Sequence, residues 1–327
     1  MSKKEKAYFH LPGLFEFYEL YKVFLPLFYH HREYFYDWCE IGSIYGSPED
    51  CLWGGGRLGE GNQNPYEVLS LMNQYHISSR LTFSNSLLQE KHLQDKRCND
   101  LCALFEKSEV QSGIIIHSDL LLEYLKKQFP RFYFVSSTTK VLTKFEQLVD
   151  DLKNKYPEFY FVSSTTKVLI DFEQLKHEMN RNDFLYVVPD FRLNKELDKL
   201  NRLSEKQKDK VEFLCNECCF IGCLERKKCY ETVSRQNLGE DCLDHVCKAM
   251  NSHEGYRFSK AMQNSSFISV EDIQNNYLPK GFSQFKIEGR SLGSALVLEF
   301  LLYYMVKPEY QIHVREAIYL DNMLDLF

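Results

Sequence analysis

The sequence predicts an α/β protein, specifically a (β/α)8 TIM-like barrel. Short β-branched or aromatic runs alternate along the chain with longer segments of helical periodicity, which is typical of parallel sheets with helical crossovers. No linker rich in Pro, Gly or Ser divides the chain. Its 327 residues, 44% of them hydrophobic, suffice for one barrel-sized domain. We therefore expect a barrel over residues 34–310, between an aromatic-rich helical segment (1–33) and a C-terminal tail (311–327).

Nine runs have the composition of β-strands. They are Tyr34–Ile41, Arg80–Ser84, Gly113–His117, Phe132–Val135, Phe159–Val162, Leu185–Val188, Val211–Leu214, Phe267–Val270 and Phe282–Ile287. Helical segments of the length that a crossover needs lie between them, for example Pro65–Gln74, Asp119–Gln128, Phe172–Met179 and Leu292–Val306. The aromatic-rich opening, Tyr8–Tyr36, is expected to pack over the barrel as a helical lid or base.

An internal duplication explains why there is one strand too many for an eight-stranded barrel. The run FYFVSSTTKVL occurs twice, 27 residues apart, within Leu125–Leu148 and Leu152–Leu175. Strand number and shear are linked in a closed barrel. We therefore expect that one copy of this helix–strand unit is displaced, or that the barrel is distorted there, and the sequence leaves open which copy holds the barrel position.

Charge and hydropathy exclude several classes of function. A net charge of −6 and a pI near 6.0 disfavour generic DNA binding, which needs a basic surface. The N-terminus lacks the apolar core of a secretory signal. The longest apolar stretch, Ala295–Val306, contains Glu299 and is too short to span a bilayer. We expect a cytoplasmic protein without a membrane partner.

Five of the eleven cysteines lie within one short segment, as Cys215, Cys218, Cys219, Cys223 and Cys229. The reducing cytosol disfavours disulfides, so metal binding is the simplest explanation. The segment follows Val211–Leu214, the sixth barrel strand if one duplicated copy is left out. It therefore lies at the C-terminal end of the barrel, where barrel enzymes carry their active sites.

The spacing of these cysteines favours an iron–sulfur cluster. Cys219, Cys223 and Cys229 read CxxxCx5C, which fits neither the paired CxxC of zinc ribbons nor the CxxxCxxC of radical S-adenosylmethionine enzymes. Thiolates suit both iron–sulfur clusters and zinc. Zinc and metal-free buried thiols remain the alternatives.

Other polar residues stand where strands are expected to end. Lys286, Glu288 and Arg290 alternate, so they share one face. They are either substrate contacts or an internal ion network. His117 is either a general base or a core histidine. Asp190 and Arg192 follow another strand, where they could serve the active rim, cap the next helix or pair with each other.

The run GFSQFKIEGRS, Gly281–Ser291, resembles the FKIEGR signature of the collagenase-like peptidase family, peptidase family U thirty-two, in which it closes a TIM-like barrel. The cysteine segment agrees in outline, with an acidic strand, cysteines, an arginine, and then Asn237, Gly239 and Cys242. The resemblance spans about Val211–Met305, and the cysteine spacing differs from the family pattern. The chain is therefore similar to a divergent member.

The resemblance implies a [4Fe–4S] cluster held by Cys219, Cys223, Cys229 and a fourth cysteine. Cys215 is the preferred fourth ligand, and Cys218 and Cys242 are its rivals. The residues expected beside the cofactor are Asn216, Glu217 and Arg226.

The resemblance also implies an iron–sulfur-dependent enzyme with redox or oxygen-independent hydroxylation chemistry. Its substrate would be a small molecule or a modified RNA, with an electron donor that the sequence does not name. The alternatives are a zinc-dependent peptidase-like hydrolase, although no HExxH or GxSxG motif is present, and a non-enzymatic redox sensor.

Overall fold

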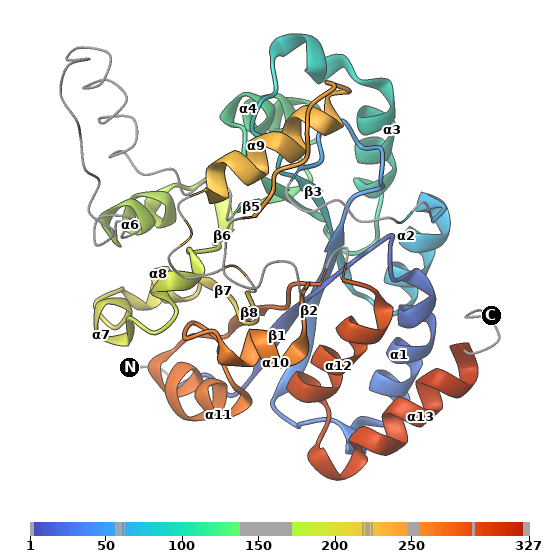
Figure 1. Ribbon diagram of the computed structural model, residues 1–327, viewed down its shortest axis with the longest axis vertical. Coiled ribbons are helices and arrows are strands. Elements are labelled where there is room, and N and C mark those ends of the chain that lie inside the picture. The colour runs from blue at the N-terminus through green and yellow to red at the C-terminus, as the bar shows by residue number, and fades with distance from the viewer. Residues whose placement is uncertain are drawn as a thin grey trace.

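The computed structural model describes residues 3–55, 61, 63–137, 172–217, 219, 223, 225–247, 255–289 and 292–322. Eight strands form one sheet in the order β6-β5-β4-β3-β2-β1-β8-β7 (Figure 1). The strands are β1 (Ala7–Pro12), β2 (Cys39–Gly46), β3 (Ser78–Phe83), β4 (Gly113–Ile116), β5 (Tyr133–Ser136), β6 (Phe184–Val187), β7 (Glu212–Leu214) and β8 (Gln284–Lys286).

The sheet closes into a barrel, as the sequence predicts. All seven strand pairs are parallel. Between the two outer strands, β6 and β7, a single parallel bridge joins Val187 to Val211, and the Val187 amide donates to the Lys210 carbonyl at 2.8 Å. The (β/α)8 TIM-like fold class is therefore confirmed.

Helices surround the strands (Figure 1). They are α1 (Tyr18–His30), α2 (Pro65–Gln74), α3 (Lys96–Phe105), α4 (Asp119–Gln128), α6 (Phe172–Asn180), α7 (Leu197–Leu200), α8 (Glu205–Lys208), α9 (Arg226–Asn237), α10 (Phe258–Gln263), α11 (Val270–Asp272), α12 (Ser294–Met305) and α13 (Gln311–Asn322). The 3₁₀ helices are η1 (Arg32–Tyr34), η2 (Glu90–Gln94), η5 (Phe191–Leu193), η8 (Leu278–Lys280) and η9 (Pro308–Tyr310), and η7 (Ile273–Tyr277) is a π-helix.

Capping residues explain where the best-predicted helices begin. The Asn64 side chain accepts a hydrogen bond from the Tyr66 amide, and Pro65 occupies the first turn of α2. The Ser118 hydroxyl caps α4 in the same way, by accepting from the Leu121 amide. Both helices have the bounds that the sequence predicts.

The opening segment is not the helical lid that its aromatic content indicated. Ala7–Pro12 forms β1, which pairs with both β2 and β8 inside the sheet. Helical structure begins only at Tyr18, with α1, which is the first crossover helix of the barrel. The strand expected at Tyr34–Ile41 is likewise displaced, because η1 ends at Tyr34 and β2 begins at Cys39.

Two further expectations need correction near the C-terminus. Phe267–Val270 is not a strand, because the Ser269 hydroxyl caps α11, which begins at Val270. The expected C-terminal tail contains α13, which packs against α1 and α12. The cysteine segment follows β7, which is the seventh strand and not the sixth because β1 was not among the predicted strands.

The first copy of the duplicated run supplies a barrel strand. Tyr133–Ser136 is β5, and it pairs directly with β6. No ninth strand therefore lies between β5 and β6. The strand expected at Phe159–Val162 falls outside the described residues.

The hydrophobic core has two parts. A large cluster fills the space between the strands and the surrounding helices. A small inner cluster lies within the barrel and consists of Tyr45, Ile115, Val135, Val188 and Leu214. None of the helices in the described ranges is long and apolar enough to cross a bilayer.

Candidate functional site

An ion pair crosses the barrel interior. Arg80 on β3 and Glu212 on β7 are 1% and 0% exposed, and Arg80 Nη1 lies 2.5 Å from Glu212 Oε2. In the sheet order these strands are four apart in either direction, so the pair joins opposite walls. Arg80 Nε also donates to the Tyr133 hydroxyl at 2.9 Å.

His10 on β1 completes this buried network. Its Nδ1 lies 2.8 Å from Ser43 Oγ, and its Nε2 lies 3.0 Å from Gln284 Oε1 and 3.4 Å from Glu212 Oε2. These partners suit a neutral ring that donates from Nε2 and accepts at Nδ1. Burial, together with the charge of Arg80, lowers the pKa of His10 to about 3, so the imidazole is uncharged near neutral pH.

Glu212 stays ionised although it is fully buried. Burial alone would raise its pKa, but the charge of Arg80, the His10 ring when it is protonated, the charge of Lys286 and the hydrogen bond from Arg80 lower it to about 2. The same carboxylate raises the pKa of Arg80, against the effect of burial. The interior therefore contains one paired carboxylate and one paired guanidinium, as buried charges require.

Lys286, the last residue of β8, lies above this network towards the C-terminal end. It is 8% exposed, and its Nζ lies 4.0 Å from the centroid of the Tyr45 ring, which is a cation–π contact. The Tyr45 hydroxyl donates to the Ile287 carbonyl at 2.6 Å. Lys286 therefore points into the barrel, as the alternation predicted.

Arg226 and Glu217 form a second buried pair at the mouth of the barrel. Arg226 Nη2 lies 2.7 Å from Glu217 Oε2, and these side chains are 11% and 1% exposed. The guanidinium carbon lies 4.9 Å from the Phe191 ring centroid and 5.3 Å from that of Tyr230. Among the described residues, Arg226 Nε and Nη1 are buried without a hydrogen-bond partner.

Asn216 fixes the chain that follows β8. Its Nδ2 donates to the Glu288 carbonyl at 2.9 Å, and its Oδ1 accepts from the Glu288 amide at 2.7 Å. The Tyr256 hydroxyl donates to the Asn216 carbonyl at 2.7 Å. Asn216, expected beside a cofactor, is therefore a positioning residue that holds the ends of β7 and β8 together.

Asp190 and Arg192 combine two of the roles that the sequence left open. Asp190 Oδ1 accepts from the Arg192 amide at 3.0 Å, which caps η5. Arg192 Nε lies 3.5 Å from the same oxygen. Arg192 Nη2 also donates to the Cys223 carbonyl at 3.2 Å, so this pair supports the cysteine segment.

Helix α9 runs across the C-terminal end of the barrel (Figure 1). Arg226 at its start pairs with Glu217, just after β7. Near its end, the Ser234 carbonyl accepts from Asn85 Nδ2 and the Ser234 hydroxyl accepts from the Ser86 amide, both at 3.1 Å. Asn85 and Ser86 follow β3, which lies opposite β7. The helix therefore bridges the mouth from one wall to the other.

Cys215, the preferred fourth ligand, does not face the mouth of the barrel. Cys215 is fully buried in the outer core, and its Sγ donates to the Phe213 carbonyl at 3.7 Å. Glu212 and Leu214 point into the barrel, so the alternation of β7 turns Cys215 away from the mouth. Burial also raises the pKa of the Cys215 thiol, which disfavours the thiolate that a metal needs.

The other cysteines are partly exposed, and the cluster itself stays a prediction. Cys219 and Cys223 lie in the loop before α9, Cys229 lies on α9, and Cys242 follows it in the chain. Cys242 Sγ donates to the Thr232 carbonyl at 3.8 Å. Across the described ranges, no three His, Cys, Asp or Glu side chains are grouped as metal ligands would be. Cys218 lies outside those ranges.

The remaining predicted site residues are His117 and Arg290. His117 follows β4 at the mouth and is half-buried, and its amide donates to the Phe83 carbonyl at 3.4 Å. This position is compatible with either role that the sequence left open. Arg290 lies outside the described residues, so the predicted alternation can be followed only as far as Glu288.

The sequence did not single out the His10–Arg80–Glu212 network. Two local signals were present, because Arg80 and Glu212 are charged residues within otherwise apolar strands. His10 and its partner Gln284 are 274 residues apart. Only the pairing of β1 with β8 brings these two together.

The comparisons with known proteins do not assign this chain to a family. No protein-family model and no curated protein matches it. Among solved structures, it is similar to that of the U32 peptidase Mk0906, with 12% sequence identity, a TM-score of 0.45, and coverage of 88% of this chain and 94% of that one. A likeness this low carries no conclusion about activity.

Proposed function

We propose that this protein is a barrel enzyme that binds a carboxylate-bearing substrate at its C-terminal mouth, with Arg226 as the anion-binding group. The observation that carries this proposal is that the Arg226 guanidinium is held in place and still has unused hydrogen-bond donors. Glu217 and two aromatic rings hold it in place, while two of its buried nitrogens have no partner among the described residues. Unused, preorganised guanidinium donors favour a carboxylate or a phosphate.

The local charge balance favours a carboxylate over a phosphate. Three cationic side chains and three acidic ones lie around the mouth, namely Arg192, Arg226, Lys286, Asp190, Glu217 and Glu288. Because the charges of these six side chains sum to zero, the mouth suits a ligand with one negative charge better than a ligand with two. The FKIEGR resemblance to a peptidase family supports peptides as the first substrates to test.

Glu288 and Tyr230 are the groups that we assign to proton transfer. Asn216 binds the Glu288 backbone through both polar groups of its side chain. The position from which the Glu288 side chain extends is therefore fixed. Burial, and next the neighbouring acidic groups and Cys219, raise the pKa of Tyr230, against the effect of Arg226. A neutral phenol beside a carboxylate provides a proton donor and a proton acceptor at one site.

Peptide binding tests the role of Arg226. Titration calorimetry with a mixed tripeptide library should give saturable binding to the wild-type protein. Arg226→Lys keeps the charge near Glu217 but removes the guanidinium donors, and it should weaken binding by about tenfold, since a hydrogen bond to a charged group contributes about 1.5–3 kcal/mol. The control is Arg315→Lys, because Arg315 pairs with Glu299 between α13 and α12.

The same library tests the chemistry. Release of new amino groups should be measurable with the wild-type protein and lost in Glu288→Gln, while peptide binding is retained. If the wild-type protein neither binds nor cleaves any peptide, and N-acetylated amino acids and other small carboxylates also fail to bind, the proposal is wrong.

A second candidate function is an iron–sulfur protein with Cys242 in place of Cys215. What supports this set is the contact of Cys242 with the Thr232 carbonyl, because Thr232 lies about one turn after Cys229 on α9. Cys219 and Cys223 lie on the loop that enters the same helix. We assign no reaction step to the cluster.

Iron and sulfide analysis of anaerobically purified protein tests this second function. If a cluster is present, Cys242→Ala should lose iron and sulfide while Cys215→Ala retains them. A wild-type protein that contains neither element would end this hypothesis and leave the role of Arg226 open to its own test.

A further inference from the structure

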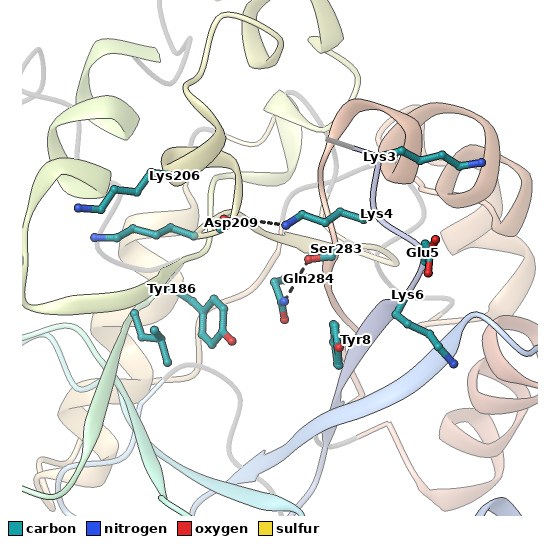
Figure 2. Close-up of a pocket in the computed structure, with 12 residues that line it drawn as sticks. Lys3, Lys4, Glu5, Lys6, Tyr8, Tyr186, Lys206, Asp209, Ser283 and Gln284 are labelled. Carbon is teal, nitrogen blue, oxygen red and sulfur yellow. Dashed lines mark hydrogen bonds and ion pairs between the residues drawn. The ribbon is translucent and has the colours of Figure 1, made fainter. Parts of the chain in front are cut away.

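A cavity lies at the opposite end of the barrel from the mouth. Its volume is about 630 Å³, which is within the usual range for small-molecule sites. Tyr8 and Gln284, near the N-terminal ends of β1 and β8, form its floor together with Tyr186 of β6 (Figure 2). The walls come from the segment before β1 and from the turn between α8 and β7.

The lining of this cavity is strongly basic in a chain that is acidic overall. Five lysines face two acidic residues there, a net charge of +3 from Lys3, Lys4, Lys6, Lys206, Lys210, Glu5 and Asp209. The whole chain carries −6. A local excess of positive charge in a concave site concentrates anions.

Two of the lysines have no protein partner among the residues that the structure describes. Lys4 reaches across to Asp209 at 2.5 Å (Figure 2), and Lys6 pairs with Glu40 at 2.9 Å. Lys3 and Lys206, by contrast, make no hydrogen bond or ion pair with another residue in the described ranges. Lys206 and Lys210 also repel each other, since the charge of Lys206 adds to burial in lowering the pKa of Lys210.

We propose that this cavity binds a compact polyanion of the triphosphate class. Such a ligand carries several negative charges, which suit a cavity with a net charge of +3, and Lys3 and Lys206 lie on opposite sides of it (Figure 2). The hydroxyls of Tyr8 and Tyr186 line the floor as further donors. Burial raises the pKa of Tyr186 to about 12, so its hydroxyl keeps its proton at neutral pH.

Two sources of a triphosphate group fit this chemistry, inorganic triphosphate and a nucleoside triphosphate. The Tyr8 and Tyr186 rings and Leu185 offer the cavity an apolar surface on which a base could stack. Inorganic triphosphate would use the lysines and the two hydroxyls and would leave this apolar surface uncovered. Comparing the two ligands therefore identifies the source.

Titration calorimetry of the full chain with sodium triphosphate and with ATP tests the proposal. Both should bind the wild-type protein, and more weakly as salt is added. The double variant Lys3→Glu/Lys206→Glu should weaken binding by about tenfold or more, since each charge contact contributes up to about 1 kcal/mol. Tighter binding of ATP identifies a nucleotide ligand, and equal affinity identifies polyphosphate itself.

A charge-matched double variant controls for the overall field. Lys107→Glu/Lys127→Glu changes the net charge equally at exposed positions that do not line the cavity, and it should leave binding within about twofold of wild type. An equal loss in this control, or no saturable binding by the wild-type protein, would overturn the proposal. So would loss of triphosphate binding in Arg226→Lys, because the ligand would then occupy the mouth.

Discussion

His10 is a histidine that the barrel keeps neutral. Its folded pKa is lowered to about 3, chiefly by burial, from an ordinary value of 6.5. Between these two values the unfolded chain binds more protons than the folded one. The free energy of unfolding therefore has its full His10 contribution above about pH 6.5 and loses it as the pH falls towards 3, by up to about 1.4 kcal/mol per pH unit.

Urea unfolding between about pH 7 and pH 5 should show this loss, and His10→Gln should flatten it. Glu212 does not interfere in this window, because its own contribution is complete above 4.5 and declines only towards its folded pKa of about 2. The exposed His313→Gln variant is the control and should keep the wild-type slope. A wild-type stability that does not change over this range would contradict the neutral state of His10.

At the scale of elements, Asn85 holds the C-terminal end of α9 against the segment that follows β3. It is fully buried, donates to the Leu52 and Ser234 carbonyls at 3.1 Å, and accepts from the Leu87 amide at 2.9 Å. Asn85→Ala should destabilise the protein by about 2 kcal/mol, because several hydrogen bonds are lost together. Hydrogen exchange should increase across α9, residues 226–237, while the barrel strands stay protected.

Asn99 provides the matched control for this experiment. On α3 it donates to the Leu93 and Asp95 carbonyls and accepts from the Tyr124 hydroxyl, so Asn99→Ala removes the same number of bonds away from the mouth. Protection of α9 should not change in that variant. Equal exchange of α9 in both variants would mean that Asn85 does not hold the helix.

Local signals predicted some elements well and failed at others for identifiable reasons. α2 and α4 begin at capping residues and have a clear helical period, so their bounds could be predicted. β1 was missed because it carries aromatic residues on both faces, and its partners β2 and β8 lie far away in the chain. Phe267–Val270 is a short apolar run that resembles a strand, but Ser269 caps a helix there.

The candidate site follows the same pattern. Glu217 and Arg226 are nine residues apart, and the sequence named both, although as cofactor-binding residues and not as a pair. Lys286 could be placed in the barrel from the alternation of its strand. The direction of Cys215 could not be predicted, because it depends on whether β7 ends before or after that residue.

At the scale of the whole molecule, the duplication allows a seamless deletion. β5 comes from the first copy and α6 (Phe172–Asn180) from the end of the second. Removing residues 141–167, 27 in all, joins SSTTK of the first copy to VL of the second and restores one uninterrupted unit.

This shortened chain should fold into the same barrel. All eight strands of the sheet are retained and β5 already pairs with β6, so the cooperative unfolding transition and the m-value for the barrel should be preserved. The control deletes residues 172–198 instead, an equal length that removes β6. A deletion of 141–167 that unfolds the protein as completely as this control would show that the second copy is required.

β1 is hydrogen-bonded on one side to β8, whose last residue is Lys286. During synthesis, the edge of β1 that pairs with β8 therefore lacks its hydrogen-bond partners until nearly the whole polypeptide has left the ribosome. Exposed strand edges invite association between nascent chains. Cells that make this protein in quantity should therefore depend on chaperones that shield its early intermediates.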